Sequence, residues 1–339
     1  MEVVTIGLDI AKSVFQAHGV DAAGEVVVRR RLTRSKLLDF FDKQPRCLVG
    51  IEACASAHYW ARELTGLGHT VRLIPPSYVK AYLKRQKNDA ADAEAICEAV
   101  TRPSMRFVPV KSVEQQDIMV LHRTRSLLMR QRVQLSNAIR AHMSEFGVVA
   151  PIGRLGLDQL IAIAADGEDA RVPDAARASL LMLVDLLRMV NQHVLENDRR
   201  IIAAARSSDV GRRLMEVPGV GPVLASALVA GVPDPASFKS GRNLAAWIGL
   251  VPRQNSSGGK ERLGSITKEG DRYLRKLLVV GAVAVLRYAQ RHGARRPWLV
   301  ALMARRKPKV AAVALANKTA RMIWAIMTSG SRYREPIAA

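Results

Sequence analysis

The hydrophobic pattern of the chain changes at Ser112, and this change limits the possible folds more than any other feature. Before Ser112, short apolar runs rich in β-branched residues alternate with amphipathic segments, which is typical of a sheet covered by helices. After Ser112, apolar residues recur at helical spacing. The sequence therefore predicts an α/β N-terminal part followed by a mainly helical remainder.

Three strand patterns open the N-terminal part, at residues 3–11, 14–20 and 25–33. The turn DAAGE between the last two favours an antiparallel meander. Helices are then expected at 35–44, 58–68 and 89–100, and strands at 47–53 and 70–75. Strands followed by alternating helix and strand predict a mixed sheet.

Two long helices are expected in the middle of the chain. The first begins at a capping box of Ser112 and Gln115. Its apolar stripe is Leu121, Leu128, Leu135, Ile139, Met143 and Phe146, and that of the second is Leu180, Leu183, Leu187, Val190, Val194 and Ile201. A break at 147–173 separates them, so the two would form a long helical hairpin or coiled coil. Such a hairpin could pair subunits or carry nucleic acid, and the sequence leaves both open.

The charge of the chain is unevenly distributed. Its 339 residues carry a formal net charge of +22, of which residues 1–100 hold +2 and residues 239–335 hold +17. So large a local excess favours a polyanion, and nucleic acid in particular, over a merely solvated basic face. With 49% hydrophobic and 24% charged residues, the chain is neither mainly disordered nor a multi-span membrane protein.

The remaining composition indicates a cytoplasmic protein with no membrane partner. The longest apolar run, Leu277–Leu286, is about half a bilayer span, and the N-terminus lacks a secretory pattern. Cys47, Cys54 and Cys97 lack zinc spacing, which fits free thiols in a reducing compartment.

Four acidic residues of the N-terminal part are candidates for metal binding. Asp9 lies in an apolar strand, Glu52 ends another, and Asp89 and Asp92 share one face of a helix. A buried carboxylate is costly unless a cation or hydrogen bonds compensate. Each acid alone has a structural explanation, such as a helix dipole or an arginine partner. Together, in this order of elements, they resemble a ribonuclease-H-like fold, whose oxygen ligands suit Mg²⁺.

The turn VPGVGP, at residues 217–222, lies between two expected helices and is typical of a helix-hairpin-helix. Gly219 and Gly221 would let backbone N–H groups approach a phosphate. Such contacts position a nucleic-acid backbone without reading its sequence. An ordinary helix–helix turn is the alternative.

Ser256 and Ser257 precede two glycines in an expected loop. The cations expected to bind nucleic acid follow this loop or lie in a basic stretch at 295–309: Lys260, Arg262, Lys268, Arg272, Arg275, Arg305, Arg306 and Lys307. A serine here could attack a phosphodiester, while cations stabilise the developing charge. No histidine lies nearby to activate it, so a linker turn is at least as good an explanation from chemistry alone.

Several segments together resemble the IS110 family of insertion-sequence transposases. They are GLDIAK at 7–12, GIEACASAHYW at 50–60, VRLIPPSYVKAYLKRQKNDAADAEAI at 71–96, VPGVGPVLA at 217–225 and WIGLVPRQNSSGGKERLGSITKEGDRYLRKLLVVGA at 247–282. The forms KNDAADAEAI and SSGGKERLG resemble its IS1111 branch. The segments follow the family's order over nearly the whole chain.

The resemblance implies three domains: a RuvC-like domain at 1–105, a coiled-coil insertion at 106–206, and a transposase domain at 207–339 with the helix-hairpin-helix, serine loop and basic tail. The family's DEDD acids match Asp9, Glu52, Asp89 and Asp92. Its catalytic serine matches Ser257, with Ser256 as the second choice.

The resemblance also implies a mechanism. Subunits would assemble as dimers and tetramers, and the acids of one subunit, holding two Mg²⁺ ions, would serve the serine of another. A structured noncoding guide RNA would pair with donor and target DNA, and strand exchange would pass through a phosphoserine intermediate. Two alternatives remain: a metal-only nuclease similar to Holliday-junction resolvases, and a non-catalytic nucleic-acid-binding protein.

Overall fold

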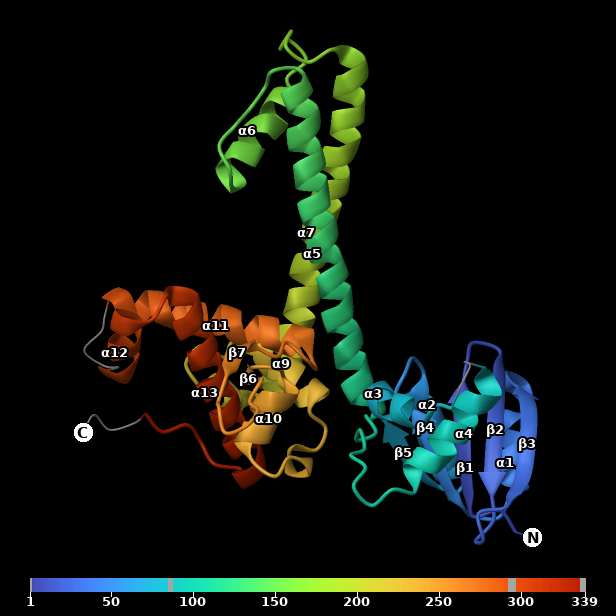
Figure 1. Ribbon diagram of the computed structural model, residues 1–339. Helices are drawn as coiled ribbons and strands as arrows, with labels where there is room; N and C mark the ends of the chain where they lie inside the picture. Colours follow the sequence, from blue (N-terminus) through green and yellow to red (C-terminus); the bar gives the residue numbers. More distant parts are fainter. Residues whose placement is uncertain (1, 85–87, 292–296, 336–339) are drawn as a thin grey trace. The chain divides into compact units, whose positions relative to one another are not determined.

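The computed structural model describes residues 2–84, 88–291 and 297–335 (Figure 1). It comprises two compact units, Met1–Val113 and Glu114–Ala339, which are described separately below. Residues 85–87 of the family-like segment, and Arg295 and Arg296 of the basic stretch, lie outside the described residues. The division into three domains at residues 105 and 206 stays a prediction.

A five-stranded mixed sheet forms the centre of the N-terminal unit, with the order β3-β2-β1-β4-β5. The strands are β1 (Thr5–Ile10), β2 (Val14–Val20), β3 (Val26–Thr33), β4 (Leu48–Glu52) and β5 (Thr70–Ile74). The first three form the antiparallel meander that the sequence predicted, and β4 and β5 join it in parallel. The predicted mixed α/β sheet is confirmed.

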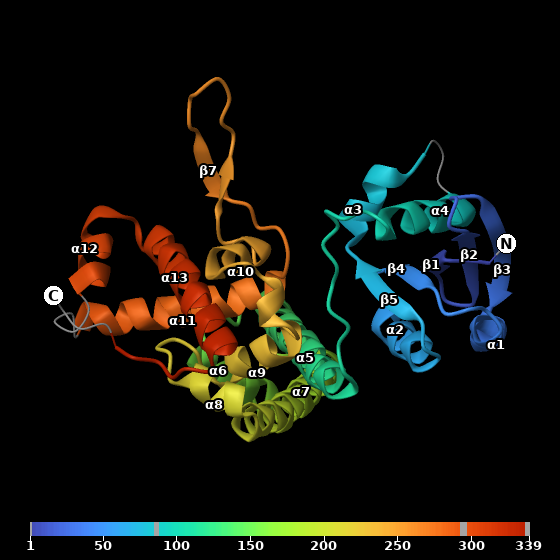
Figure 2. The ribbon, with the colours of Figure 1, turned by 90° about the horizontal axis from the view of Figure 1, so that it is seen from below.

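Helices cover both faces of this sheet (Figure 2). They are α1 (Leu37–Asp42), α2 (Ala57–Gly66), α3 (Pro76–Val79) and α4 (Asp89–Val100), with short 3-10 turns η1 (Arg34–Lys36) and η2 (Lys80–Tyr82). One buried cluster joins Phe41 and Leu64 of α1 and α2 to the sheet, and another joins Ile96 of α4 to Ile74. The sheet is therefore held between two apolar layers.

The second unit begins with two long helices, α5 (Val113–Glu145) and α7 (Asp174–Ser207), which run side by side (Figure 1). The Asn197 side-chain amide donates to the Leu121 carbonyl at 3.0 Å, and Arg125 pairs with Asp198 at 2.5 Å. Both contacts join the two helices. The long helical hairpin is thus present, whereas its assignment as a coiled coil stays a prediction.

Two details of this hairpin differ from the sequence analysis. The expected break at 147–173 contains a further helix, α6 (Arg154–Ala165), which buries Leu160 and Ala164 against the hairpin. The Arg177 guanidinium fixes its end by donating to the carbonyls of Ile163 and Ala164, at 3.2 and 3.3 Å. Phe146, expected on the buried stripe, lies past the end of α5 and is exposed.

The rest of the second unit is a helical core. Its elements are α8 (Asp209–Met215), α9 (Pro222–Gly231), η3 (Pro235–Ser237), α10 (Gly241–Trp247), β6 (Pro252–Gln254), β7 (Leu263–Ile266), α11 (Arg272–Arg291), α12 (Pro297–Arg305) and α13 (Pro308–Ser329). Leu228, Leu244, Leu278 and Ile323 belong to one buried cluster that joins these helices. Helix α11 buries one face, which carries Leu274, Leu278 and Ala282, whereas Val280 is exposed.

A buried polar contact fixes α5 to this core. His122, only 1% exposed, hydrogen bonds through its two ring nitrogens with the hydroxyls of Tyr273 and Ser226, at 3.0 and 2.8 Å. Burial, and after it the neighbouring Arg125 charge, lower the pKa of His122 to about 4. The imidazole is therefore neutral at neutral pH and joins α5 to α9 and α11.

Two helices among the described residues, α7 and α13, are long and apolar enough to cross a membrane by length and composition. Core helices of soluble proteins pass the same test. Leu187 of α7 and Ile323 of α13 are both buried within the fold, so this property is weak evidence for a membrane span.

Candidate active site

The first two candidate acids lie at the same edge of the sheet. The parallel register of β1 and β4 pairs Leu8 with Ile51, and Asp9 and Glu52 are the next residue of each strand. Adjacent parallel strands present residues in register on a common face. The sheet thus brings these two positions to one edge.

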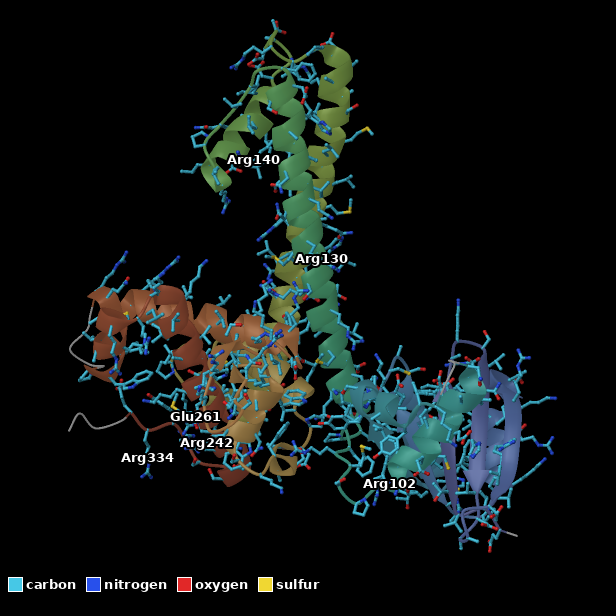
Figure 3. All side chains as sticks on the ribbon, in the orientation of Figure 1. Arg102, Arg130, Arg140, Arg242, Glu261 and Arg334 are labelled. Atoms are coloured by element: carbon cyan, nitrogen blue, oxygen red, sulfur yellow. The ribbon has the colours of Figure 1, made fainter. Side chains whose placement is uncertain are left out.

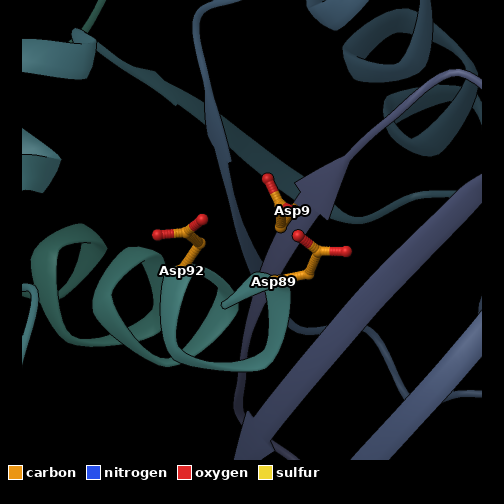
Figure 4. A group of neighbouring side chains, drawn as sticks. All are labelled: Asp9, Asp89 and Asp92. Atoms are coloured by element: carbon orange, nitrogen blue, oxygen red, sulfur yellow. The ribbon is translucent and has the colours of Figure 1, made fainter. Parts of the chain in front are cut away.

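Helix α4 begins at this edge and supplies the other two acids. Asn88 caps its N-terminus, since its side-chain oxygen accepts the Ala91 backbone N–H at 2.8 Å. Asp89 and Asp92 lie in the first turn, and their carboxylates face the same space as that of Asp9 (Figure 4). One carboxylate oxygen from each of the three lies within 4.8 Å of the others.

Gly7 permits this approach, and the sequence analysis missed it. A Cβ at Gly7 would collide with the backbone of Ala93 and Cys97, because α4 packs directly on β1 there. The available signal was a glycine two residues before Asp9, together with small residues one turn apart on α4. A larger residue at position 7 would push α4 and its two acids away from Asp9.

Glu52 is not part of the three-carboxylate group. Burial raises the pKa of the nearby Cys54 thiol, and the charges of Glu52 and Asp9 raise it further. Both carboxylates therefore act on the same thiol. Glu52 therefore lies near Asp9, but it does not belong to the group whose carboxylate oxygens all lie within 4.8 Å of one another.

The chemistry of the three carboxylates fits a hard divalent cation. Their donors are all oxygen, and they come from a strand and a helix that are packed together. Oxygen ligands at this spacing suit Mg²⁺-type ions, which usually keep several waters beside one or two carboxylates. Asp89 is exposed and Asp9 and Asp92 are half-buried, so solvent and substrate can reach the group.

The two candidate serines lie in the expected loop, which joins the two strands of an exposed β-hairpin. Strands β6 and β7 pair antiparallel, and Gly258 and Gly259 form the tip with φ of 56° and 75°. The Ser256 hydroxyl accepts the Arg262 backbone N–H at 3.2 Å. The Ser257 carbonyl accepts from the Lys260 backbone N–H at 3.1 Å, and its side chain is exposed.

The turn between α8 and α9 gives its two glycines different surroundings. Gly219, with φ of 87°, packs against Gly281 of α11, where a Cβ would come within 2.9 Å of the Gly281 carbonyl. Gly221 precedes α9 and is open, because a Cβ there would meet nothing within 4 Å. Gly219 is therefore required by packing, and phosphate contact at either glycine stays a prediction.

Most of the candidate cations are exposed, whereas Arg275 is engaged by the protein. Its Nη1 donates to the carbonyls of Ile248 and Glu269, at 2.6 and 2.8 Å. The exposed ones are Lys260, Arg262, Lys268, Arg272, Arg305, Arg306 and Lys307. Exposed arginines also extend along α5, where Arg130 is labelled in Figure 3.

Comparison with known proteins agrees with these features. A family model described as "Transposase" of the DEDD IS110 type matches residues 6–147, which include all four acids. A second, "Transposase IS116/IS110/IS902 family", matches residues 211–296, which include both serines and the α8–α9 turn.

Several relatives are similar over nearly their whole length. A "Probable family 20 transposase" of Pseudomonas aeruginosa is 50% identical over 98% of this chain and 99% of its own. A "Putative transposase y4pF/y4sB" of Sinorhizobium fredii is 45% identical over 98% and 86%. The "Transposase for insertion sequence element IS1111A" of Coxiella burnetii is 39% identical over 98% and 92%. The chain belongs to the IS110 family of insertion-sequence transposases and is a DNA-processing enzyme.

Proposed function

We propose that this transposase is an RNA-guided DNA recombinase that cuts and rejoins DNA through a covalent phosphoserine. The main support is the contrast between its two candidate groups. Three carboxylates converge within 4.8 Å on packed elements, and two serines lie at the tip of an exposed hairpin. The first arrangement suits metal binding, and the second suits a nucleophile that must reach DNA.

Asp9, Asp89 and Asp92 would hold Mg²⁺, with Glu52 as a fourth ligand at the shared edge, and two ions would fit the chemistry. Bound there, divalent cations would lower the pKa of an attacking hydroxyl and neutralise charge on the phosphate. The residues themselves supply fixed oxygen donors. Gly7 lets α4 pack on β1, and Asn88 caps the turn that carries two of the acids.

Ser257 would be the nucleophile. Its Oγ attacks a DNA phosphorus, the Oγ–P bond forms as the bond to a DNA oxygen breaks, and the hydroxyl proton goes to the departing oxygen. A DNA hydroxyl then attacks the same phosphorus and releases the serine. One ester bond replaces another at each step, so no ATP is required. The nearby cations Lys260 and Arg262 would stabilise charge on the phosphate.

The chain would act as a homodimer or a tetramer of paired dimers. Exposed apolar residues recur every seven positions on α5, at Val113, Val120 and Leu127. Facing stripes with this period associate helices of separate chains. Association would let the acids of one subunit serve the serine of another, which answers the lack of a histidine near the serines.

Donor DNA, target DNA and a structured guide RNA would bind the basic residues of the second unit. Residues 239–335 hold 21 of the 52 Lys and Arg residues and only four of the 30 Asp and Glu residues. Such an excess supplies affinity for phosphates and leaves sequence choice to base pairing. The protein would work in the cytoplasm, with no membrane partner.

The test compares two neighbouring serines. Purified protein, guide RNA, donor and target DNA are mixed with Mg²⁺, and protein–DNA adducts are resolved on a denaturing gel. We expect Ser257→Ala to abolish both adduct and strand exchange, and Ser256→Ala to retain them at reduced level, because Ser256 only closes the hairpin tip. Normal cleavage without an adduct in Ser257→Ala would instead establish the metal-only nuclease.

A further inference from the structure

A cavity of about 830 Å³ lies in the second unit, and none of the candidate acids or serines lines it. Its walls come from the start of α10, the start of α12 and one side of α13. The volume falls in the range of pockets that bind small organic groups. The sequence analysis missed this site because its residues come from three separate segments.

The polar residues of the cavity are strongly cationic. Arg242, Lys318 and Arg321 line it, and no acidic residue does (Figure 3 labels Arg242). Among the described residues, no carboxylate forms an ion pair with any of the three. Uncompensated cations around a pocket attract an anion, and arginine is well suited to phosphate.

The rest of the lining is mainly apolar and includes an exposed aromatic ring. Trp298 is 42% exposed, and the Lys318 Nζ lies 4.2 Å from its ring centroid. The lining also contains the small residues Ala314 and Ala325. An aromatic ring next to cations suits an unpaired nucleotide, because the base offers a flat face for stacking and the phosphate of the same nucleotide can contact the cations.

The walls of the cavity are fixed by contacts outside it. The Asn317 side-chain amide donates to the Leu250 carbonyl at 3.1 Å, and the Trp324 indole N–H donates to the Pro235 carbonyl at 3.0 Å. A Cβ at Gly241 would lie 3.0 Å from the Arg321 backbone, so α10 and α13 are in close contact. A preformed pocket loses less entropy on binding.

We propose that this cavity binds a single unpaired nucleotide, with its base against Trp298 and its phosphate at Arg242 and Arg321. A free phosphate would gain nothing from the apolar lining, and a paired base has no free face to stack. The ligand is therefore a nucleotide extruded from a duplex or part of a single strand. This inference depends on the chain handling nucleic acid and is independent of Ser257 and of the four acids.

The experiment uses the full-length protein and short labelled oligonucleotides, measured by fluorescence anisotropy. One set is DNA and the other RNA, each with an intact or an abasic central nucleotide. We expect the abasic change and Trp298→Ala each to weaken binding about tenfold, and the two together to weaken it no further. Trp298→Phe should retain most of the affinity because it keeps an aromatic face.

Trp247→Ala is the matched control, since Trp247 is 40% exposed and lies outside the cavity. Photocrosslinking with iodouracil at the central position should label the peptide that contains Trp298 and spare the one that contains Trp247. The oligonucleotide that crosslinks, DNA or RNA, identifies the source of the nucleotide.

Two results would overturn the proposal. One is equal affinity of wild-type protein for intact and abasic oligonucleotides, which needs no variant and therefore no assumption about folding. The other is normal binding by Trp298→Ala with an unchanged melting temperature. With this second result, weaker binding by Arg321→Gln would show that the cavity is a charged surface and not a base pocket. A failed strand-exchange assay would bear on Ser257 and the acids alone.

Discussion

The acid group and the serine hairpin are built in opposite ways. Asp9 and the two acids of α4 come from a strand and a helix whose backbones touch at Gly7. Ser256 and Ser257 lie on a two-stranded hairpin whose residues 253–265 are all exposed. Metal ligands must keep their geometry, whereas a nucleophile that forms a bond to DNA must reach it. Under the proposed function, the molecule is closely packed where metal ligands would be needed and exposed where attack on DNA would take place.

The hairpin also lacks the means to activate its own serine. Residues 252–266 contain no histidine, and their one acid is Glu261, labelled in Figure 3. Serine is a weak nucleophile without an adjacent base or metal. Under the proposed function, each group would therefore be incomplete alone, and the predictions below test this dependence.

The largest effect is expected at the acid group. Asp9→Asn should lower the rate of strand exchange about a thousandfold or more, because a bound cation contributes several kcal/mol to phosphoryl transfer. Mg²⁺ binding measured by calorimetry should weaken in parallel. Asp39→Asn, an exposed acid on α1, is the control and should change neither. Unchanged exchange in Asp9→Asn would remove the metal role.

A mixture of two inactive variants tests whether the two groups come from different subunits. Asp9→Asn and Ser257→Ala, each inactive alone, should regain activity when mixed and allowed to exchange subunits. Activity should reach about a quarter of the wild-type level if subunits pair at random, since one site in four then combines intact parts. Continued inactivity of a mixture shown to contain mixed dimers would place both groups in one chain.

The contrast also depends on a stable helical core that carries the hairpin. His122 helps to hold this core together, because it joins α5 to α9 and α11. Its pKa of about 4 lies below the ordinary value, so the unfolded chain takes up its proton first as pH falls. The stabilisation is complete above pH 6.5 and is lost towards pH 4, by at most about 3 kcal/mol. Chemical denaturation should show this loss, and His122→Gln should flatten it. His142→Gln, an exposed position on the same helix, should leave the slope unchanged.

The smallest effects are expected from substitutions of single cations. They should distinguish an exposed cation from one that hydrogen bonds within the protein. Lys260→Gln at the hairpin tip should weaken DNA binding a few-fold and lower the salt slope of log K by about 1, as for one lost phosphate contact. Arg275→Gln should mainly lower the melting temperature, because Arg275 holds the carbonyls of Ile248 and Glu269. A lower salt slope for Arg275→Gln at unchanged stability would reverse these roles.

The sheet and the long helices were predictable because their patterns are local. Runs rich in β-branched residues predicted β1 to β3, and the heptad of Leu121, Leu128 and Leu135 predicted α5. Helix α6 was missed because flanking glycines and a proline favoured a break, while burial of Leu160 against the hairpin stabilises it. Local pattern cannot register such a tertiary contact.

The acids could be proposed from sequence because each stands out against its apolar neighbours, and the structure brings three of them together. What the sequence did not reveal are contacts between distant segments. Gly7 against Cys97, and Trp298 beside Lys318, join residues that are far apart or unremarkable in the chain. The roles of Ser256 and Ser257 remain predictions, because each is exposed and chemistry alone decides between them.

Peptide mapping of the protein–DNA adduct tests the central claim most directly. The adduct formed with Mg²⁺ is digested with nuclease and protease, and the peptide spanning residues 254–262 is sequenced by mass spectrometry. The account predicts a nucleotide joined through phosphate to the Ser257 hydroxyl and an unmodified Ser256. Cleaved DNA with free ends and no modified peptide, or a nucleotide on another residue, would contradict it.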